Sequence, residues 1–253
     1  MKIQVVSDLH FEFGSQHLLY QMKHCDSDIL VIAGDLHTSR GIISALHQVY
    51  DAVQKHIILV PGNHEYYHSQ KIHIDALLHE EFKNHQYIHV LNDAVWEYNN
   101  VVFLGSTGWW TMNAAKDAVK YMNDFTYIND LIPNNYGLDW GWKSYEFFNT
   151  NLKKYDKRVS GKNVVCISHN APSLQSIGDE FKDDPLNPCF ANCWQHFMLS
   201  YKPHVWIHGH VHGNKEYRFD DTLVVCNPFG YDGHSTNVLF DPHKIICLPD
   251  LYI

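Results

Sequence analysis

The sequence of 253 residues predicts an α/β fold in which helices cover a largely parallel β-sheet. Two observations support this prediction. Short apolar runs rich in valine and isoleucine recur along the chain and are typical of buried strands. Segments with apolar residues at helical spacing lie between the early runs, and strands that alternate with helices indicate crossover units. We expect a single domain over residues 1–253, because this length lies at the upper end of what one core supports.

Five predicted strands each end within three residues of a polar side chain that could bind a metal or a phosphate. Their sequences are KIQVV (2–6), DILVIA (28–33), HIILV (56–60), NVVCI (163–167) and HVWI (204–207). Residues 42–53 and 190–201 place apolar side chains every three or four positions, which predicts an amphipathic helix in each segment.

The pattern changes in two places. From about residue 214, the runs KEYRF, TLVVC, TNVLF and KIICL are separated by tight turns, so we predict that an antiparallel meander closes the chain. Residues 107–140 fit neither pattern and are rich in Trp, Tyr, Asn and Asp. We interpret this stretch as a lid-like insertion.

Composition narrows the classes of function. The formal net charge of −9 argues against a protein that binds nucleic acid mainly through the phosphates, because such binding favours a basic face. No apolar run approaches the roughly 18 residues that a membrane span needs. The start, MKIQVVSDLH, has too short an apolar stretch for a signal peptide, and the six cysteines show no paired spacing. We therefore expect a cytoplasmic protein with reduced thiols and no membrane partner.

Side chains that bind metals or phosphates follow the five predicted strands. In chain order they are Asp8, His10, Asp35, Asn63, His64, His169, His208, His210 and His212. Because the carboxyl ends of parallel strands share one edge of a sheet, these residues should converge. The neighbouring glycines Gly34, Gly62 and Gly209 would allow sharp turns and a close approach of side chains.

The types of these residues indicate a metal site. Carboxylate, imidazole and amide ligands without cysteine suit Mn, Fe, Co or Zn. The candidates are too many for one tetrahedral ion, but two ions about 4 Å apart with a bridging carboxylate would use them all. The predicted cofactor is therefore a pair of divalent metal ions, with manganese favoured and Fe, Zn or Co as alternatives.

The motifs SDLH, GD, GNHE, SH and GHVH resemble, in this order, those of the calcineurin-like metallophosphoesterase superfamily, and the match covers nearly the whole chain. Within it, the sequence is most similar to small bacterial and phage-type enzymes of broad or unknown substrate. The resemblance implies a four-layer α/β/β/α sandwich with mixed sheets. By motif position it also implies the ligands, with Asp8, His10 and His212 on one metal, Asn63, His169 and His210 on the other, and Asp35 as the bridge.

The resemblance further implies an activity, the hydrolysis of phosphomonoesters or phosphodiesters. A hydroxide that bridges the metals would attack the phosphorus in line, and His64 would contact the phosphate and assist the leaving group. The expected partner is a small phosphorylated substrate rather than nucleic acid. Two alternatives stay open, namely a nuclease of the same superfamily and a metal-binding interaction scaffold without catalysis.

Three further residues have weaker predicted roles around the ligands or the substrate. His208 lies just before the Gly-His-x-His core, and we interpret it as a support for the ligands or a packing residue. Asn170 follows His169 at a position where many relatives carry histidine or glycine. Trp109 is a candidate for stacking on a nucleobase or an aryl group of the substrate, and packing within the insertion explains it equally well. The sequence leaves the physiological substrate, the preference for monoesters or diesters and the oligomeric state open.

Overall fold

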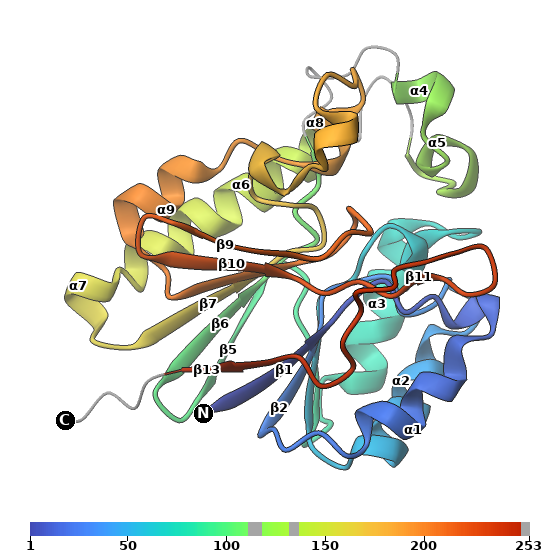
Figure 1. The fold of residues 1–253 in the computed structure, drawn as a ribbon, viewed down its shortest axis with the longest axis horizontal. Coiled ribbons are helices and arrows are strands. Elements are labelled where there is room, and N and C mark those ends of the chain that lie inside the picture. The colour runs from blue at the N-terminus through green and yellow to red at the C-terminus, as the bar shows by residue number, and fades with distance from the viewer. Residues whose placement is uncertain (111–117, 132–136, 249–253) are drawn as a thin grey trace.

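The computed structural model describes residues 1–110, 118–131 and 137–248, and it shows two stacked β-sheets with helices on both outer faces (Figure 1). The first sheet has the strand order β13-β1-β2-β3-β4. Its strands are β1 (Lys2–Val6), β2 (Ile29–Ile32), β3 (His56–Leu59), β4 (Ile88–Val90) and β13 (Ile245–Cys247). The first four run parallel, and β13 runs antiparallel to β1.

The second sheet has the strand order β5-β6-β7-β8-β10-β9. Its strands are β5 (Ala94–Tyr98), β6 (Val101–Gly105), β7 (Asn163–Ile167), β8 (Val205–His208), β9 (Lys215–Phe219) and β10 (Thr222–Cys226). The four central strands are parallel, and the edge strands β5 and β9 are antiparallel to their neighbours. Two short strands, β11 (Gly230–Tyr231) and β12 (Ser235–Thr236), pair separately.

The helices divide between the two outer faces. Those near the first sheet are α1 (Leu18–Met22), α2 (Ile42–Val53) and α3 (Lys71–Phe82), and those over or beyond the second are α4 (Ala118–Tyr121), α5 (Asp124–Tyr127), α6 (Gly137–Lys154), α7 (Lys157–Ser160), α8 (Asn187–Phe190) and α9 (Gln195–Tyr201). Short 3₁₀ turns are η1 (Phe11–Phe13), η2 (Ser15–His17), η3 (His64–Tyr66), η5 (Leu174–Ser176) and η6 (Asp179–Phe181). The helix predicted over 42–53 is present as α2.

Three apolar layers hold these elements together. Alternate residues of a strand face opposite sides of its sheet, so in β2 Leu30 and Ile32 pack under α2 while Ile29 and Val31 pack between the sheets. In the second sheet, Ile207 of β8 faces the layer between the sheets, and Trp206 faces α6 and α9. Helix, sheet, sheet and helix therefore form the four layers that the sequence resemblance implies.

The predicted closing meander is wrong. Of the four predicted runs, only KEYRF and TLVVC pair with each other, as the antiparallel strands β9 and β10, and β10 itself runs parallel to β8. Of the run TNVLF only Thr236 lies in a strand, Val238 is 93% exposed, and Phe240 alone packs against a core cluster, so the run does not form a buried strand. The last run forms β13, which leaves the second sheet and pairs with β1, because that position buries Ile246 between the sheets.

The helix predicted over 190–201 is also interrupted. Helix α8 ends at Phe190 and α9 begins at Gln195, because Ala191 pairs with Ala171 and the amide of Trp194 donates to the carbonyl of Pro172. Within the insertion predicted over 107–140, α4 and α5 are described, whereas residues 111–117 and 132–136 lie outside the described residues. The single-domain assignment and the lid role stay predictions. None of the helices in the described ranges has the length and apolarity to cross a membrane.

Candidate metal centre

The predicted ligands come together where the loops after the parallel strands leave the two sheets. The expectation of one sheet edge was too simple, because the loops after β1, β2 and β3 leave the first sheet and those after β7 and β8 leave the second. Three sets of side chains each bring their ligand atoms within 4.8 Å of one another. They are Asp8, His10 and His212; Asp35, His169 and His210; and His10, Asp35 and His64.

The first set lies between the ends of β1 and β8. Nε2 of His212 is 3.3 Å from Oδ1 of Asp8 and 3.3 Å from Nε2 of His10. Nδ1 of His10 donates to the carboxylate of Glu12 over 3.1 Å, which leaves Nε2 of His10 to face the other ligand atoms. These contacts put one carboxylate and two imidazole nitrogens around a common point.

The second set adds the amide of Asn63. Nε2 of His169 is 3.0 Å from Oδ1 of Asn63 and 3.4 Å from Oδ2 of Asp35. Nδ1 of His169 donates to the carbonyl of Ala33 over 2.9 Å, so Nε2 is again the atom that faces the site. Oδ2 of Asp35 also lies 3.7 Å from Nε2 of His10, which places Asp35 between the two sets.

The donor atoms fit divalent cations. Asp8 is fully buried and Asp35 is 2% exposed, and the ion-pair partners described for both are histidines. Burial lowers the pKa of His169, but the charges of Asp35 and Asp8 outweigh it and raise that pKa to about 10, which indicates a strong local demand for positive charge. Nε2 of His210 is buried without a hydrogen-bond partner in the described chain, and burial lowers the pKa of His210 to about 3. A neutral imidazole with an unpaired nitrogen is what a metal ligand requires.

An uncommon backbone conformation is frequent among the predicted ligands, which make up five of the eleven non-glycine residues with positive φ in the described part of the chain. Five of the seven predicted ligands have a left-handed backbone, with φ of 53° at Asp8, 47° at His10, 57° at Asp35, 68° at His210 and 48° at His212. This region costs free energy for residues other than glycine and is concentrated at functional sites. A Cβ on Gly62 would lie 2.2 Å from Oδ1 of Asp35, so close approach demands glycine there.

The carboxylate of Glu65 holds the loops after β2 and β3 together. It is fully buried and accepts hydrogen bonds from the backbone amides of Gly62 at 2.6 Å, Leu36 at 2.7 Å and Asp35 at 3.0 Å. The same motif that supplies Asn63 and His64 therefore also anchors the loop that carries Asp35.

His64 lies at the border of both ligand sets and stacks on Tyr67, with 4.2 Å between ring centroids. Its Nε2 is 4.0 Å from Oδ2 of Asp35, and its Nδ1 donates to Oε1 of Glu12 over 2.8 Å. Burial disfavours the charged ring, but Asp35 and the hydrogen bond to Glu12 outweigh it and raise the pKa of His64 above its ordinary value. His64 also lines the cleft beside the ligands, so it can reach a bound ester.

Glu12 is a site residue that the sequence reasoning missed. One carboxylate oxygen, Oε1, accepts from both His10 and His64. Burial alone would raise the pKa of Glu12, but these two hydrogen bonds lower it to about 2. The only sequence signal is its position two residues after His10.

Asp124 is a second missed residue and comes from α5, within the insertion. It is 1% exposed, and its Oδ1 accepts from Nδ2 of Asn63 at 2.8 Å and from the hydroxyl of Tyr67 at 2.7 Å. These bonds fix which end of the Asn63 amide faces His169, so that the oxygen is the atom offered to a metal. In the sequence, Asp124 is one of several acidic residues in a segment without periodicity, so no signal pointed to it.

We expect Asp124→Asn to weaken binding of the metal assigned to Asn63 by roughly 10–100-fold, the usual effect of losing a residue that orients a ligand. The reason is that an amide at 124 can also donate, so the Asn63 amide is no longer held in one orientation. Calorimetric titration of metal-free protein with Mn²⁺ measures the affinity. Asp130→Asn is the matched control, because Asp130 lies in the same insertion and accepts from the amide of Lys71 instead. Equal affinity in both variants would contradict the role given to Asp124.

His208 and Asn170 are buried but belong to none of the ligand sets. Nδ1 of His208 donates to the carbonyl of Gly209 over 2.9 Å, and its Nε2 lies 2.9 Å from the hydroxyl of Ser176. The amide of Asn170 donates to the carbonyl of Cys189 over 2.7 Å. Both residues therefore tie loops together beside the ligands.

His208→Ala should retain most of its metal and lose activity only by about 10–100-fold, because both ring nitrogens bind atoms outside the ligand sets. His210→Ala and His212→Ala should each lose a metal ion. Metal analysis of the three purified variants measures this difference. If all three lost the same amount of metal, the placement of His208 outside the ligand sets would be wrong.

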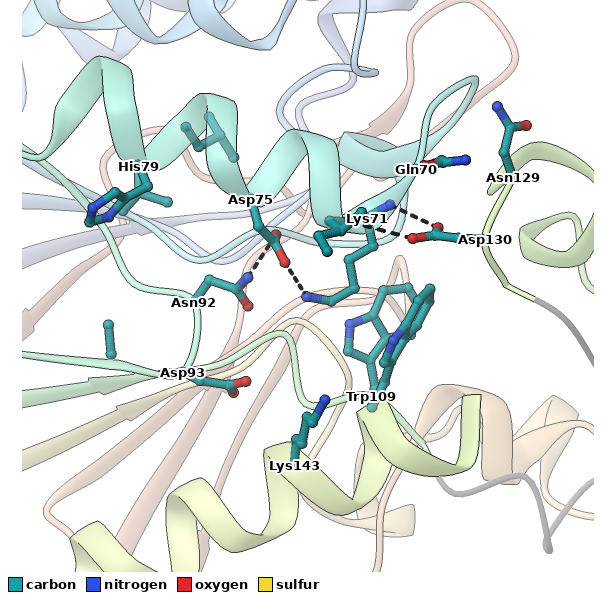
Figure 2. Close-up of a pocket in the computed structure, with 15 residues that line it drawn as sticks. Gln70, Lys71, Asp75, His79, Asn92, Asp93, Trp109, Asn129, Asp130 and Lys143 are labelled. Atoms are coloured by element: carbon teal, nitrogen blue, oxygen red, sulfur yellow. Dashed lines mark hydrogen bonds and ion pairs between the residues drawn. The ribbon is translucent and has the colours of Figure 1, made fainter. Parts of the chain in front are cut away.

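Trp109 lies away from the ligands, in a second cavity of about 830 Å³ between α3, β5 and α6 (Figure 2). Its ring is 5.1 Å from that of Trp140. Lys71 and Asn92 both bind the carboxylate of Asp75 in this cavity, at 2.6 Å and 2.8 Å. The carboxylate of Asp75 is therefore already bound by Lys71 and Asn92, and none of the metal-binding groups of the described chain lies in this cavity.

A cleft of about 420 Å³ opens directly on the ligands. One wall comes from the insertion and the other from residues 177–190. Besides site residues, its lining includes Tyr121, Met122, Ile177, Phe181, Leu186, Phe190 and Tyr231. The ring of Phe190 stacks on His210, with 4.8 Å between centroids, so the apolar wall begins at a ligand.

Comparisons with known proteins agree with the fold. The chain is 25% identical over 288 residues to an uncharacterised protein of Acanthamoeba polyphaga mimivirus, with 99% of this chain and 98% of that protein covered. It is similar to the crystal structure of a phosphopantetheinyl hydrolase from Mycobacterium tuberculosis, with a TM-score of 0.73, 17% identity and coverage of 96% and 97% of the two chains. A dimetal phosphatase from Danio rerio has a TM-score of 0.54 and 16% identity, with 89% and 86% covered.

The family model described as calcineurin-like phosphoesterase matches residues 1–214, a range that includes every predicted ligand. The motifs, the two stacked sheets and this match agree with one another. The chain belongs to the calcineurin-like phosphoesterase family.

Proposed function

We propose that the protein hydrolyses small phosphomonoesters or phosphodiesters with two divalent metal ions, of which manganese is the favoured kind. The observation that supports this most strongly is the position of Asp35, whose Oδ2 lies 3.7 Å from His10 in one ligand set and 3.4 Å from His169 in the other. One carboxylate between two further sets of imidazole, amide and carboxylate donors is the arrangement that a pair of cations needs.

The residues of the chain have separate tasks in this proposal. Asp8, His10 and His212 would hold one ion, Asn63, His169 and His210 would hold the other, and Asp35 would contact both. Bound divalent ions supply Lewis acidity to the phosphoryl oxygens and make an attacking hydroxide available near neutral pH. The cleft orients the ester, and His64 stands at its edge with its Nδ1 held by Glu12. Nε2 of His64 would donate a proton to the departing oxygen.

The test is to load metal-free protein with Mn²⁺, Zn²⁺, Fe²⁺ or Co²⁺ and to measure bound metal and hydrolysis together. The substrate panel contains aryl monoesters and diesters, nucleotides, single-stranded DNA and a phosphopantetheinyl ester, the last because of the name of the Mycobacterium hydrolase. We expect two ions per chain, hydrolysis of small esters, and complete loss of activity on chelation. Activity that survives exhaustive chelation would overturn the proposal.

The same panel separates the two alternatives. A nuclease would cleave single-stranded DNA faster than any small ester, which the formal net charge of −9 disfavours. A silent scaffold would bind metal and hydrolyse nothing. Cytoplasmic location and a small phosphorylated partner remain predictions.

A further inference from the structure

The cleft beside the ligands has an apolar wall that the chemistry of phosphate alone does not require. Met122 of the insertion packs in one cluster with Cys189, Leu186 and Phe190 of the opposite wall. Phe181 lines the same cleft and is 55% exposed, an unusual position for a phenylalanine unless something covers it. The apolar wall therefore consists of a packed cluster around Met122 and Cys189 and the exposed ring of Phe181.

Apart from the histidines at the metal site, the ionisable side chains most able to carry charge in this cleft are acidic. Among its described lining residues there is no lysine or arginine, and the carboxylates are those of Asp35, Asp124 and Asp184. Asp35 belongs to two ligand sets and Asp124 accepts a hydrogen bond from Asn63, whereas Asp184 is exposed and accepts from the backbone amide of Leu186. The segment 179–184 along this wall carries four acidic residues and one lysine.

The formal charges at the metal site also limit how many anionic groups a substrate can carry. Two carboxylates, Asp8 and Asp35, would hold the proposed pair of divalent ions, which leaves a local formal charge of about +2, or about +1 once the attacking hydroxide is bound. A phosphate monoester carries about −1.5 to −2 near pH 7. One phosphoryl group is therefore matched, and a second anionic group on the substrate would meet Asp184 and an apolar wall.

We infer that this cleft is a subsite for an uncharged apolar or aryl leaving group, so that the preferred substrates carry one phosphoryl group and no other anion. The inference rests on the proposed function, because it places the leaving group of that reaction. Phe181, Leu186 and Phe190 would bury the group, and Asp184 would select against a negative charge on it.

The first test compares phenyl phosphate with carboxyphenyl phosphates whose phenols have similar acidity, using the Mn²⁺-loaded protein. We expect kcat/KM to be about 10-fold or more higher for the neutral aryl ester. Equal values, or a higher value for the anionic ester, would overturn the inference.

Two pairs of variants test the named residues. Phe181→Ser should lower kcat/KM for phenyl phosphate roughly 10-fold through KM, whereas Leu199→Ser, at a residue that is also 55% exposed but outside the cleft, should leave it unchanged. Asp184→Lys should raise kcat/KM for the carboxyphenyl ester roughly 10-fold, and Asp183→Lys, one residue away and not in the lining, should have much less effect. Equal effects within either pair would count against the subsite.

Binding without turnover separates this inference from the proposed function. Calorimetric titration with phenylphosphonate and with phosphonoacetate, neither of which has an ester bond to break, should show tighter binding of phenylphosphonate with a negative heat-capacity change. Such binding by a protein that hydrolyses no ester would leave the subsite in place and overturn the function. If the protein hydrolysed esters but bound phenylphosphonate and phosphonoacetate equally well, the proposed function would stand and the subsite would be wrong.

Discussion

Asp35→Asn is expected to lose both metal ions and to reduce phosphoesterase activity by roughly 10³-fold or more. The carboxylate lies between the two ligand sets, so its charge acts on both ions, and metal catalysis is worth several kcal/mol of transition-state stabilisation. Asparagine also tolerates the left-handed backbone found at this residue, where φ is 57°, so the fold should persist. Metal analysis after Mn²⁺ loading, together with kcat/KM for an aryl ester, measures the effect.

Asp220→Asn is the matched control for this change. Asp220 has nearly the same backbone conformation, with φ of 51°, but pairs with Lys202 on the surface. We expect it to keep two metal ions and full activity. If Asp35→Asn also kept two ions, the bridging role of Asp35 would be wrong. A single ion in the unchanged protein would contradict the dinuclear proposal itself.

His64→Ala is expected to slow hydrolysis of alkyl phosphate esters by about 10²–10⁴-fold while it affects activated aryl esters much less. A proton donor matters most when the leaving group is a poor one, because an alkoxide departs slowly without a proton and a nitrophenolate departs readily. The hydrogen bond from Nδ1 of His64 to Glu12 and the nearby charge of Asp35 both favour the protonated ring. Steady-state kinetics with paired alkyl and nitrophenyl esters measures the difference.

Metal content is the second readout for His64→Ala. It should not change, although Nε2 of His64 lies 4.0 Å from Oδ2 of Asp35 and could be read as a ligand from that distance. Loss of metal would place His64 among the ligands. The same slowing for both types of ester would leave it as a phosphate contact only.

The sequence predicts the strands and the ligand-bearing loops well because this information is local. Each ligand lies within a few residues of the end of an apolar run, as with Asp8 after β1 and His169 after β7. The α/β class, the helix over 42–53 and the motif order follow from the same local patterns.

Residues that support the ligands could not be predicted in this way. Asp124 reaches Asn63 across 61 positions, and Glu12 reaches His64 across 52, and no periodicity or motif links either pair. The pairing of β13 with β1 could not be predicted from the sequence for a similar reason. An apolar run predicts a strand, but the choice between β10 and β1 as its neighbour depends on which face of the assembled core is still open.

The pairing of β13 with β1 has a consequence for synthesis on the ribosome. Lys2 is matched with Cys247, and the amide of Val5 donates to the carbonyl of Lys244. One edge of β1 pairs with β2, which is made early, but at a translation rate of about 5–20 residues per second roughly 10–50 s pass before β13, the partner at the other edge, exists. During that time the nascent chain carries an unpaired strand edge, the kind of surface that recruits other strands. A ribosome-bound chain stalled before residue 244 should therefore show fast amide hydrogen exchange at Val5, and slow exchange there would mean that another segment protects this edge first.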